Sequence, residues 1–440
     1  MKNIARISQI KDIEKIAKNI KINIPSSKSY LNRALILSSI QKNKVILSNV
    51  FEICNDVKDM ISCLKKIGLK IEINDKIDGS KDVIVYGNGG KFTKPKDGIL
   101  NCGIGGTTTR FLLGLSSLFD FDVIITAEKK MLERPVGEVI DFLKQIGKKV
   151  EFLEKENCLP IKLTGKTKNI DKIKLDCSKS SQFLSSVLLV ANKLNIKQID
   201  VKNLVSKSYI NITLNVLKKF NINFTKTKQD NSIIYKNKTS KKINNLNKIQ
   251  KIAIEKDCSS ASYFLALQEI FNIKKNIIKI DKNSSQGDAN FIKIIKKIRD
   301  FKHKKNKQTL ILNMENMPDV SMTAMIICSL CDFKTKIKGL QTLPNKECDR
   351  LSAMHDEFKK IGIKTEISKK LDAITVYGNS KLKLKNIIEI ETYNDHRIAM
   401  CFAILGAKIG NVDIKNLDVV SKSFVNFWDE LNKFKCVKMI

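Results

Sequence analysis

Arginine is scarce in this chain of 440 residues. Lys and Arg together number 80 against 45 Asp and Glu, which gives a formal net charge of +35, yet only seven of the basic residues are Arg. Proteins that grip nucleic acid normally use Arg freely, because its planar guanidinium binds phosphate through two parallel hydrogen bonds. Aromatic residues, which stack on bases, make up only 6% of the chain. We therefore expect no nucleic-acid partner. A nucleic-acid-binding protein stays open as an alternative, but only the net charge supports it.

Histidine is also scarce, and cysteine occurs in an odd number. The chain has three His and eleven Cys, and many of the Cys lie in apolar segments. This pattern fits free, buried thiols in a reducing compartment better than a secreted disulfide scaffold. Cys328 and Cys331 form a C-x-x-C, but no second pair accompanies them, and no segment has metal-ligand spacing. We expect neither a metal nor a cofactor.

Long hydrophobic runs are missing as well. The apolar stretches fall short of the roughly 20 residues that a membrane span needs, and charges interrupt the first twenty residues, unlike a signal peptide. The chain is nevertheless 42% hydrophobic, enough to bury a core, and it is too long for one compact core. These features predict a cytoplasmic protein of two domains without a membrane partner.

A helix-to-strand junction recurs six times along the chain. In each copy an amphipathic helix ends in a Lys-rich turn, and alternating strand residues follow it; clear copies lie around Gly68, Gly147 and Asn221, and weaker ones around Arg299, Gly362 and Lys435. Gly and Asn suit the left-handed backbone that ends many helices, and alternation predicts a half-buried strand. The repeat predicts a pseudo-symmetric α/β architecture of six units.

Polar clusters coincide with the starts of predicted helices. A helix start attracts anions through its unpaired N–H groups and its dipole. Ser, Thr or Asp there can be simple N-caps, the commoner explanation for any one of them, but that does not explain cations at the same positions: Lys28, Arg33, Arg134, Lys346, Arg350, Arg397 and Lys422. Five of the seven Arg fall in these clusters: Arg33, Arg110, Arg134, Arg350 and Arg397. This concentration favours a small polyanionic ligand.

Candidates for acid–base chemistry are few. Asp319 and Glu347 are carboxylates within cationic clusters. Nearby cations lower the pKa of a carboxyl group and closure of a site raises it, and such opposed effects suit general acid–base catalysis. Taken singly, a helix cap for Asp319 and an ion pair for Glu347 explain these residues equally well. Among the three His, only His396 is expected in a site.

Taken together, these segments resemble the EPSP synthase (3-phosphoshikimate 1-carboxyvinyltransferase) family. The motifs SSKSYLNR, GGTTTR, ERPVG, SSQF, SKSYINITLN, DCSSASYFLA, NSSQGD, MPDVSMTA, KECDRLSAM, YNDHRIAMCF and SKSF follow the order of the family from about residue 22 to 430. The resemblance implies an α/β fold, an inside-out α/β barrel of two domains with three βαβαββ units each and the active site in the interdomain cleft. We expect domain I at residues 1–26 and 256–440 and domain II at residues 27–255.

The resemblance also implies a reaction and its residues. The carboxyvinyl group of phosphoenolpyruvate would pass to the 5-hydroxyl of shikimate 3-phosphate by addition and elimination, releasing phosphate, in the pathway to chorismate and aromatic amino acids. The catalytic residues would be Asp319 as proton acceptor from the hydroxyl, Glu347 as the group that protonates the methylene carbon and later removes a proton, and Lys28 as a cation or acid. Phosphoenolpyruvate would contact Lys28, Gly106, Arg134, Gln182, Arg350, Arg397 and Lys422. Shikimate 3-phosphate would contact Lys28, Ser29, Arg33, Ser180, Ser181, Gln182, Ser206, Tyr209, Asp319 and Lys346.

Two positions depart from the family pattern. Ile104 replaces the usual Asn of a Gly-Asn-x-Gly-Thr turn, and Thr342 stands where an Asn often contacts shikimate 3-phosphate; both bear on affinity more than on the reaction. The alternative within this fold is the sister enzyme that transfers the same group to UDP-N-acetylglucosamine. The paired SSQF and SKSY segments and the Asp-His-Arg triplet at Asp395 favour the shikimate enzyme. Its partners would be the two small substrates, and we expect a monomer.

Overall fold

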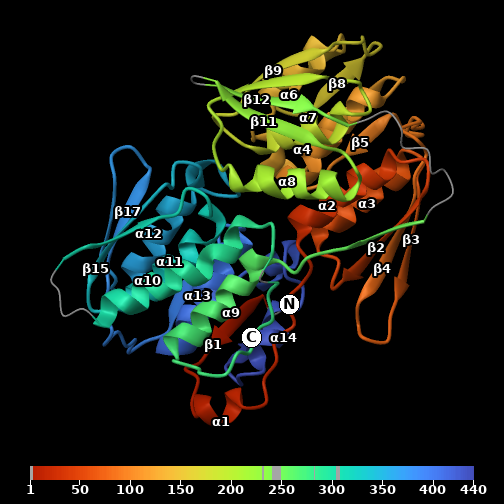
Figure 1. The fold of residues 1–440 in the computed structure, drawn as a ribbon. Helices are drawn as coiled ribbons and strands as arrows, with labels where there is room; N and C mark the ends of the chain where they lie inside the picture. The colour runs from red at the N-terminus through yellow and green to blue at the C-terminus, as the bar shows by residue number, and fades with distance from the viewer. Residues whose placement is uncertain (1–2, 230–231, 240–248, 282, 304–307) are drawn as a thin grey trace. The chain divides into compact units, whose positions relative to one another are not determined.

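The chain forms two compact units, each with its own hydrophobic core (Figure 1). The computed structural model describes residues 3–229, 232–239, 249–281, 283–303 and 308–440. Unit 1 comprises residues 1–25 and 256–440, and unit 2 comprises residues 26–255. Both ends of the chain belong to unit 1, where the first strand pairs with the last one.

Unit 2 alternates helices with short strands. Its helices are α2 (Lys28–Ser39), α3 (Asn55–Lys66), α4 (Gly106–Leu115), η1 (Ser116–Leu118), α5 (Lys129–Leu132), α6 (Gly137–Gln145), α7 (Gln182–Ala191) and α8 (Ser208–Lys219). Its strands are β2 (Lys44–Val50), β3 (Lys70–Asp75), β4 (Lys81–Tyr86), β5 (Ile99–Asn101), β6 (Val123–Thr126), β7 (Lys149–Phe152), β8 (Ile161–Thr164), β9 (Lys172–Asp176), β10 (Gln198–Lys202), β11 (Phe224–Gln229), β12 (Ser232–Asn237) and β13 (Gln250–Ala253).

Unit 1 follows the same alternation. Its helices are α1 (Ile13–Ala17), α9 (Cys258–Ile270), η2 (Gly287–Asn290), α10 (Phe291–His303), η3 (Pro318–Val320), α11 (Ser321–Ser329), η4 (Leu343–Asn345), α12 (Arg350–Lys360), α13 (His396–Ile409), η5 (Leu417–Lys422) and α14 (Phe427–Asn432). Its strands are β1 (Ile4–Ile7), β14 (Leu310–Asn313), β15 (Lys334–Lys338), β16 (Thr365–Ile367), β17 (Ala373–Tyr377), β18 (Ile388–Ile390), β19 (Val412–Lys415) and β20 (Val437–Met439).

Five four-stranded sheets share one topology. Their strand orders are β13-β2-β4-β3, β5-β6-β8-β7 and β9-β10-β12-β11 in unit 2, and β14-β15-β17-β16 and β18-β19-β1-β20 in unit 1. In every sheet the first pair of strands is parallel and the next two pairs are antiparallel. The mixed α/β class expected from the sequence is confirmed. Within the described ranges the helix pair α9 and α10 has no corresponding sheet, although the N–H of Ile22 donates to the carbonyl of Ile277 over 2.9 Å.

The predicted helix-to-strand junctions form in five of the six copies. A residue with positive φ ends the helix at Gly68 (95°), Gly147 (89°), Asn221 (58°), Gly362 (81°) and Lys435 (55°), and a strand follows each one. At the first copy the N–H groups of Gly68 and Leu69 donate to the carbonyls of Lys65 and Leu64, which is the hydrogen-bond pattern of a Schellman cap. In the remaining copy the junction expected around Arg299 was wrong, because Arg299 lies within α10, which continues to His303; residues 304–307, which follow this helix, lie outside the described ones.

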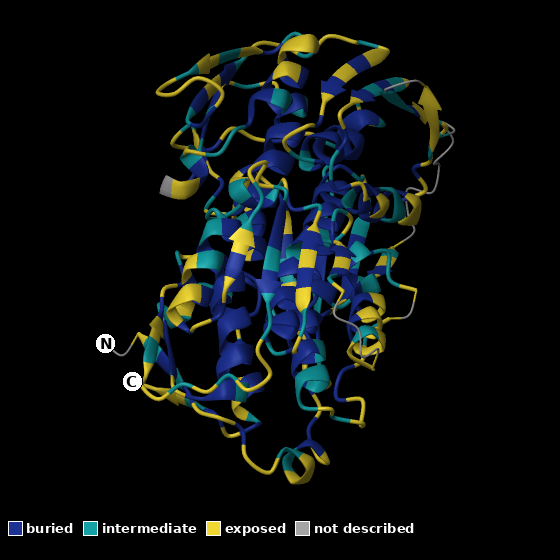
Figure 2. Ribbon diagram, turned by 90° about the vertical axis from the view of Figure 1, so that its left-hand side faces the viewer, coloured by how far each residue is buried: buried dark blue, intermediate teal, exposed yellow. Residues whose placement is uncertain are grey.

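The central helices of both units are buried almost along their whole length (Figure 2). All ten residues of α4 are buried, as are 13 of the 14 residues of α13. A helix covered on all sides can present polar groups only at its ends, so the fold directs polar chemistry to the helix starts. All eleven Cys are free thiols, and ten of them are buried. Among the described residues, no helix combines the length and the apolar character that crossing a membrane requires.

Candidate functional site

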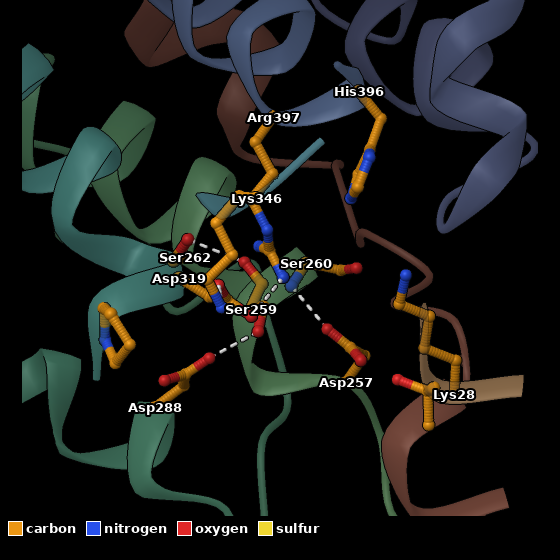
Figure 3. A network of polar contacts seen from close by, with 12 residues as sticks. Lys28, Asp257, Ser259, Ser260, Ser262, Asp288, Asp319, Lys346, His396 and Arg397 are labelled. Carbon is orange, nitrogen blue, oxygen red and sulfur yellow. Dashed lines mark hydrogen bonds and ion pairs between the residues drawn. The ribbon is translucent and has the colours of Figure 1, made fainter. Parts of the chain in front are cut away.

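Asp319 is the centre of a charged cluster in unit 1 (Figure 3). It lies in η3, which begins at Pro318 and leads into the buried helix α11. One carboxylate oxygen lies 3.2 Å from Nζ of Lys346 and 3.1 Å from Nη1 of Arg350, and the other lies 3.1 Å from Nη2 of Arg397. One carboxylate thus contacts three cations from two segments, residues 346–350 and the start of α13.

Arg350, the first residue of α12, holds the cluster together. Its guanidinium donates to Asp395 through Nε (2.7 Å) and Nη2 (3.3 Å), to Asp319 through Nη1, and to Glu347 through Nη2 (2.7 Å). Burial opposes its charge, but the carboxylates of Asp395, Glu347 and Asp319 raise the pKa of Arg350. This arginine is therefore a permanent cation with a fixed orientation.

Glu347 is the second carboxylate of the cluster, and it bridges Arg350 and Lys422, whose Nζ lies 3.2 Å away. The sequence predicted Lys422 at the start of a helix, and this was wrong: Lys422 is the last residue of η5, and α14 begins only at Phe427. On the other side of Asp319, burial lowers the pKa of Lys346, and Asp319 partly offsets the effect.

The carboxylate of Asp395 makes two kinds of contact at the start of α13. Its Oδ1 accepts the backbone N–H of Arg397 (2.8 Å) and so caps the helix, while the same carboxylate binds Arg350. The Arg397 side chain also donates through Nη1 to the hydroxyl of Tyr263 (3.4 Å). Burial raises the pKa of Tyr263, which keeps it a phenol at neutral pH. His396 is buried, with Nδ1 at 3.7 Å from Oδ1 of Asp395.

A further buried carboxyl group, Asp288 in η2, belongs to the same region (Figure 3). It accepts a hydrogen bond from the hydroxyl of Ser259 in the first turn of α9. Burial, and next the charge of Asp319, raise the pKa of Asp288 to about 7. Near neutral pH this group therefore exists in both protonation states.

In unit 2, Lys28 opens α2 and forms an ion pair of 2.7 Å with Asp56 of α3. Ser27 caps the helix by accepting the N–H of Tyr30. Asp56 is only 2% exposed, so the ammonium group of Lys28 is tied to a buried anion.

Arg33 lies one turn further along α2 and is almost fully buried. It donates to the hydroxyls of Thr213 (2.7 Å) and Ser185 (3.3 Å) and to the carbonyls of Ser29 (2.6 Å) and Tyr209 (3.4 Å). Burial lowers the pKa of Arg33 to about 9. In the described part of the chain no carboxylate forms an ion pair with it.

Arg110 and Gln182 connect the starts of α4 and α7. Arg110 donates to Oε1 of Gln182 (2.6 Å), whose Nε2 donates to Thr107 (3.1 Å). The backbone N–H of Gln182 donates to the hydroxyl of Ser180 (3.2 Å). Ser181 is buried and is the N-cap residue of α7.

Gly106, the first residue of α4, lies against Arg134, which precedes α6. A Cβ at Gly106 would lie 2.8 Å from Nη1 of Arg134, so the guanidinium occupies the space that a side chain would need. At the start of α8, Ser206 is buried with a positive φ of 49°, and its carbonyl accepts the N–H of Tyr209 (3.2 Å).

The two residues that depart from the family pattern, Ile104 and Thr342, differ in their exposure to solvent. Ile104 is exposed beside Gly105, the N-cap residue of α4. Thr342 is the N-cap residue of η4, and its hydroxyl is buried without a hydrogen bond to the described residues.

The structure thus groups the predicted residues within each unit. Unit 1 brings together Asp319, Lys346, Glu347, Arg350, Arg397 and Lys422. Unit 2 holds separate small groups: Lys28 with Asp56, Arg33 with Ser29 and Tyr209, Gln182 with Ser180, and Gly106 with Arg134. The predicted site residues did not include five of these partners: Asp56, Arg110, Tyr263, Asp288 and Asp395.

These contacts allow the cluster in unit 1 to bind anions and to transfer protons. Several cations with fixed donors can bind phosphate or carboxylate groups. Asp319 and Glu347 can exchange protons with a bound molecule once its anionic groups take over those donors. Among the described residues, no group of His, Cys, Asp and Glu has the arrangement of a metal site.

Comparisons with known proteins agree on one family. The family model described as EPSP synthase (3-phosphoshikimate 1-carboxyvinyltransferase) matches residues 10–431. A 3-phosphoshikimate 1-carboxyvinyltransferase of Buchnera aphidicola subsp. Cinara cedri is 38% identical over 421 residues, 93% of each chain. One of Colwellia psychrerythraea is 32% identical over 430 residues, 95% of this chain and 97% of its own.

Solved structures show the same fold. EPSP synthase from Acinetobacter baumannii superposes with a TM-score of 0.72 at 20% identity, over 100% of this chain and 99% of its own. The enolpyruvyl transferase NikO from Streptomyces tendae gives a TM-score of 0.69 at 10% identity, over 99% and 98% of the two chains. At these identities the likeness concerns the fold alone.

Proposed function

Because the chain belongs to the EPSP synthase (3-phosphoshikimate 1-carboxyvinyltransferase) family, we propose that it transfers the carboxyvinyl group of phosphoenolpyruvate to the 5-hydroxyl of shikimate 3-phosphate. The products are 5-enolpyruvylshikimate 3-phosphate and phosphate. Membership of this family makes the protein a transferase. The free thiols fit a protein that acts in a reducing cytoplasm, and we propose that it acts on these two small molecules as a monomer.

The observation that carries the proposal is the pair of carboxylates among cations in unit 1. Both substrates bear phosphate and carboxylate groups, so they repel each other unless cations hold them. We assign phosphoenolpyruvate to Arg350, Arg397 and Lys422 of unit 1 and to Lys28, Gly106, Arg134 and Gln182 of unit 2. We assign shikimate 3-phosphate to Asp319 and Lys346 of unit 1 and to Lys28, Ser29, Arg33, Ser180, Ser181, Gln182, Ser206 and Tyr209 of unit 2.

The proton transfers fall to Asp319 and Glu347. Asp319 accepts the proton of the 5-hydroxyl while the hydroxyl oxygen bonds to C2 of phosphoenolpyruvate. Glu347, which takes up a proton from solvent, delivers it to the methylene carbon, which becomes a methyl group, and a tetrahedral ketal phosphate results. Glu347 then removes a proton from that methyl group as the carbon–oxygen bond to phosphate breaks, and the proton held by Asp319 passes to the departing phosphate. Lys28 assists as a cation or acid.

The charged network explains how Asp319 and Glu347 become available for proton transfer when the substrates bind. In the structure, Asp319 and Glu347 occupy the donors of Lys346, Arg350, Arg397 and Lys422. Substrate phosphate and carboxylate groups compete for the same donors. Each donor that turns to substrate leaves a lone pair of Asp319 or Glu347 available for a proton.

The test is a phosphate-release assay with phosphoenolpyruvate and two acceptors in parallel. We expect phosphate release with shikimate 3-phosphate and none with UDP-N-acetylglucosamine. The reverse result would assign the chain to the sister reaction. The absence of turnover with either acceptor, together with steep salt-dependent binding of random DNA, would favour a nucleic-acid-binding protein.

A further inference from the structure

A cavity of about 350 Å³ lies in unit 1 among α9, α10, α11, α13 and the segment 380–383. These helices lie together in Figure 1. The volume is at the lower end of the range for small-molecule sites. Its lining shares no residue with those assigned above to phosphoenolpyruvate or shikimate 3-phosphate. The cavity therefore has no part in the proposed transfer.

The inner wall of the cavity is apolar. It includes Ile298 of α10, Ile327 of α11 and Ile409 of α13, each at most 7% exposed. Leu330 and Leu382, both half-buried, continue this wall. A hydrocarbon group that binds here would be stabilised by about 25 cal/mol for each Å² of apolar surface that it removes from water.

The rim of the cavity is cationic. Five basic residues contribute to it: Arg299, Lys302, Lys381, Lys383 and Lys408. The lining contains one carboxylate, Glu269, and Arg299 already binds it through Nε (3.3 Å) and Nη2.

The lysines of the rim have weaker partners: hydrogen bonds from Ser380, and next the charges of Lys302 and Lys381, lower the pKa of Asp332. Within the described ranges no ion pair joins Lys302, Lys381 or Lys383 to a carboxylate, and Nζ of Lys408 lies 4.7 Å from the centroid of the Phe271 ring. Just outside the lining, Asp332 accepts the backbone N–H of Ser380 (3.0 Å). Lysine is abundant throughout this sequence, so the charge of these lysines alone is unspecific. Their position around a concave site with isoleucine side chains at its inner wall distinguishes this rim, because a concave site concentrates the field of its charges.

We propose that this cavity binds a small amphipathic anion, a hydrocarbon body that carries one carboxylate or phosphate group. The hydrocarbon body contacts Ile298, Ile327 and Ile409. The anionic group lies at the rim and reduces the mutual repulsion of the lysines. Binding of this anion does not require that phosphoenolpyruvate or shikimate 3-phosphate be bound.

The test measures binding of 4-(trifluoromethyl)benzoate to the full chain by ¹⁹F NMR in about 0.1 M salt, where surface charges are screened beyond roughly 10 Å. The double variant Lys381→Glu/Lys383→Glu reverses two charges at the rim. Its matched control, Lys226→Glu/Lys228→Glu, reverses two exposed charges on β11 in unit 2. The neutral 4-(trifluoromethyl)benzamide serves as the uncharged probe.

We expect the Kd for the benzoate to rise at least tenfold in the rim variant and less than twofold in the control. We also expect the benzamide to bind at least tenfold more weakly than the benzoate. Leu382→Ser, a change in a surface segment, should weaken binding of the benzoate about threefold through the apolar wall. Equal losses in the two double variants, equal binding of the two probes, or no binding to the unaltered chain would overturn the proposal.

Discussion

At the scale of single residues, protein carboxylates neutralise most of the cations at the helix starts. Asp395, Asp319 and Glu347 surround Arg350, and Asp56 holds Lys28. The sequence predicted the positions of the cations, since Arg is rare and clusters visibly. It could not predict their partners, because Arg350 and Asp395 are 45 residues apart and only tertiary structure joins them. An external anion must therefore compete with these protein carboxylates for the hydrogen-bond donors of the cations.

Arg397→Lys tests whether the guanidinium geometry matters beyond its charge. Lysine keeps the charge but cannot reach both Asp319 and Tyr263, as Arg397 does. We expect kcat/KM to fall about 100-fold, which corresponds to roughly 2.7 kcal/mol of transition-state stabilisation, with little change in Tm. The matched control is Arg6→Lys, which weakens a bidentate pair with Asp413 between β1 and β19. If both variants kept normal kinetics, the argument from arginine placement would be wrong.

Asp288→Asn tests the buried carboxyl group. Its pKa is raised to about 7 in the folded chain, against an ordinary value near 3.9 in the unfolded chain. Between these values the unfolded chain releases the proton and the folded chain keeps it, so the contribution of Asp288 to stability is full below about pH 4 and is lost as the pH rises through 7. The stability of the unaltered chain relative to the variant should fall by roughly 4 kcal/mol from pH 4 to pH 8.

Thermal unfolding of both proteins at several pH values measures this difference. Asp141→Asn, which removes an exposed carboxylate of α6, is the control and should not reproduce the trend. A difference between unaltered chain and Asp288→Asn that stays constant with pH would contradict the assignment.

At the scale of elements, local patterns were predictable and long-range pairing was not. The helix ends at Gly68, Gly147 and Gly362 follow from local backbone preference, because glycine adopts positive φ without strain. The pairing of β13 with β2 joins residues about 200 positions apart, with Gln250 opposite Val45, and no local signal encodes that register. For the same reason the sequence located the helix starts near Asp319, Arg350 and Arg397, but it misplaced the one at Lys422 and missed Asp288, whose polar segment gives no sign that it is buried.

Two glycines of the same helix α4 should respond differently to alanine. A Cβ at Gly106 would meet the flexible end of the Arg134 side chain, whereas a Cβ at Gly114 would lie 2.8 Å from the backbone carbonyl oxygen of Ser186. We expect Gly106→Ala to displace the guanidinium and raise the KM for phosphoenolpyruvate about tenfold with an unchanged Tm. Gly114→Ala should leave KM unchanged and destabilise the fold by about 1–2 kcal/mol through overpacking. Steady-state kinetics and thermal unfolding of the two variants check this contrast, and similar changes in both would refute it.

At the scale of the whole molecule, the net charge of +35 describes composition more than function. Most of it is lysine, while five of the seven arginines occur in the polar clusters at helix starts. Each unit has its own core and its own part of the residues assigned to the two substrates. Covered helices in both units restrict polar chemistry to helix ends, so the repeated fold itself explains why the candidate residues occur in such similar settings.

The most direct test of the proposed transfer is the reaction run in D₂O with phosphoenolpyruvate and shikimate 3-phosphate, followed by ¹H and ³¹P NMR. Addition converts the methylene carbon into a methyl group, and elimination removes one of its three hydrogens, so solvent deuterium should appear in the vinyl group of the product. We expect one equivalent of phosphate for each enolpyruvyl product, and deuterium in the vinyl group of a large share of that product, because one of the three hydrogens of the methyl group comes from solvent. A product without deuterium would contradict the proton transfers assigned to Glu347, and the absence of any enolpyruvyl product would contradict the proposed function itself.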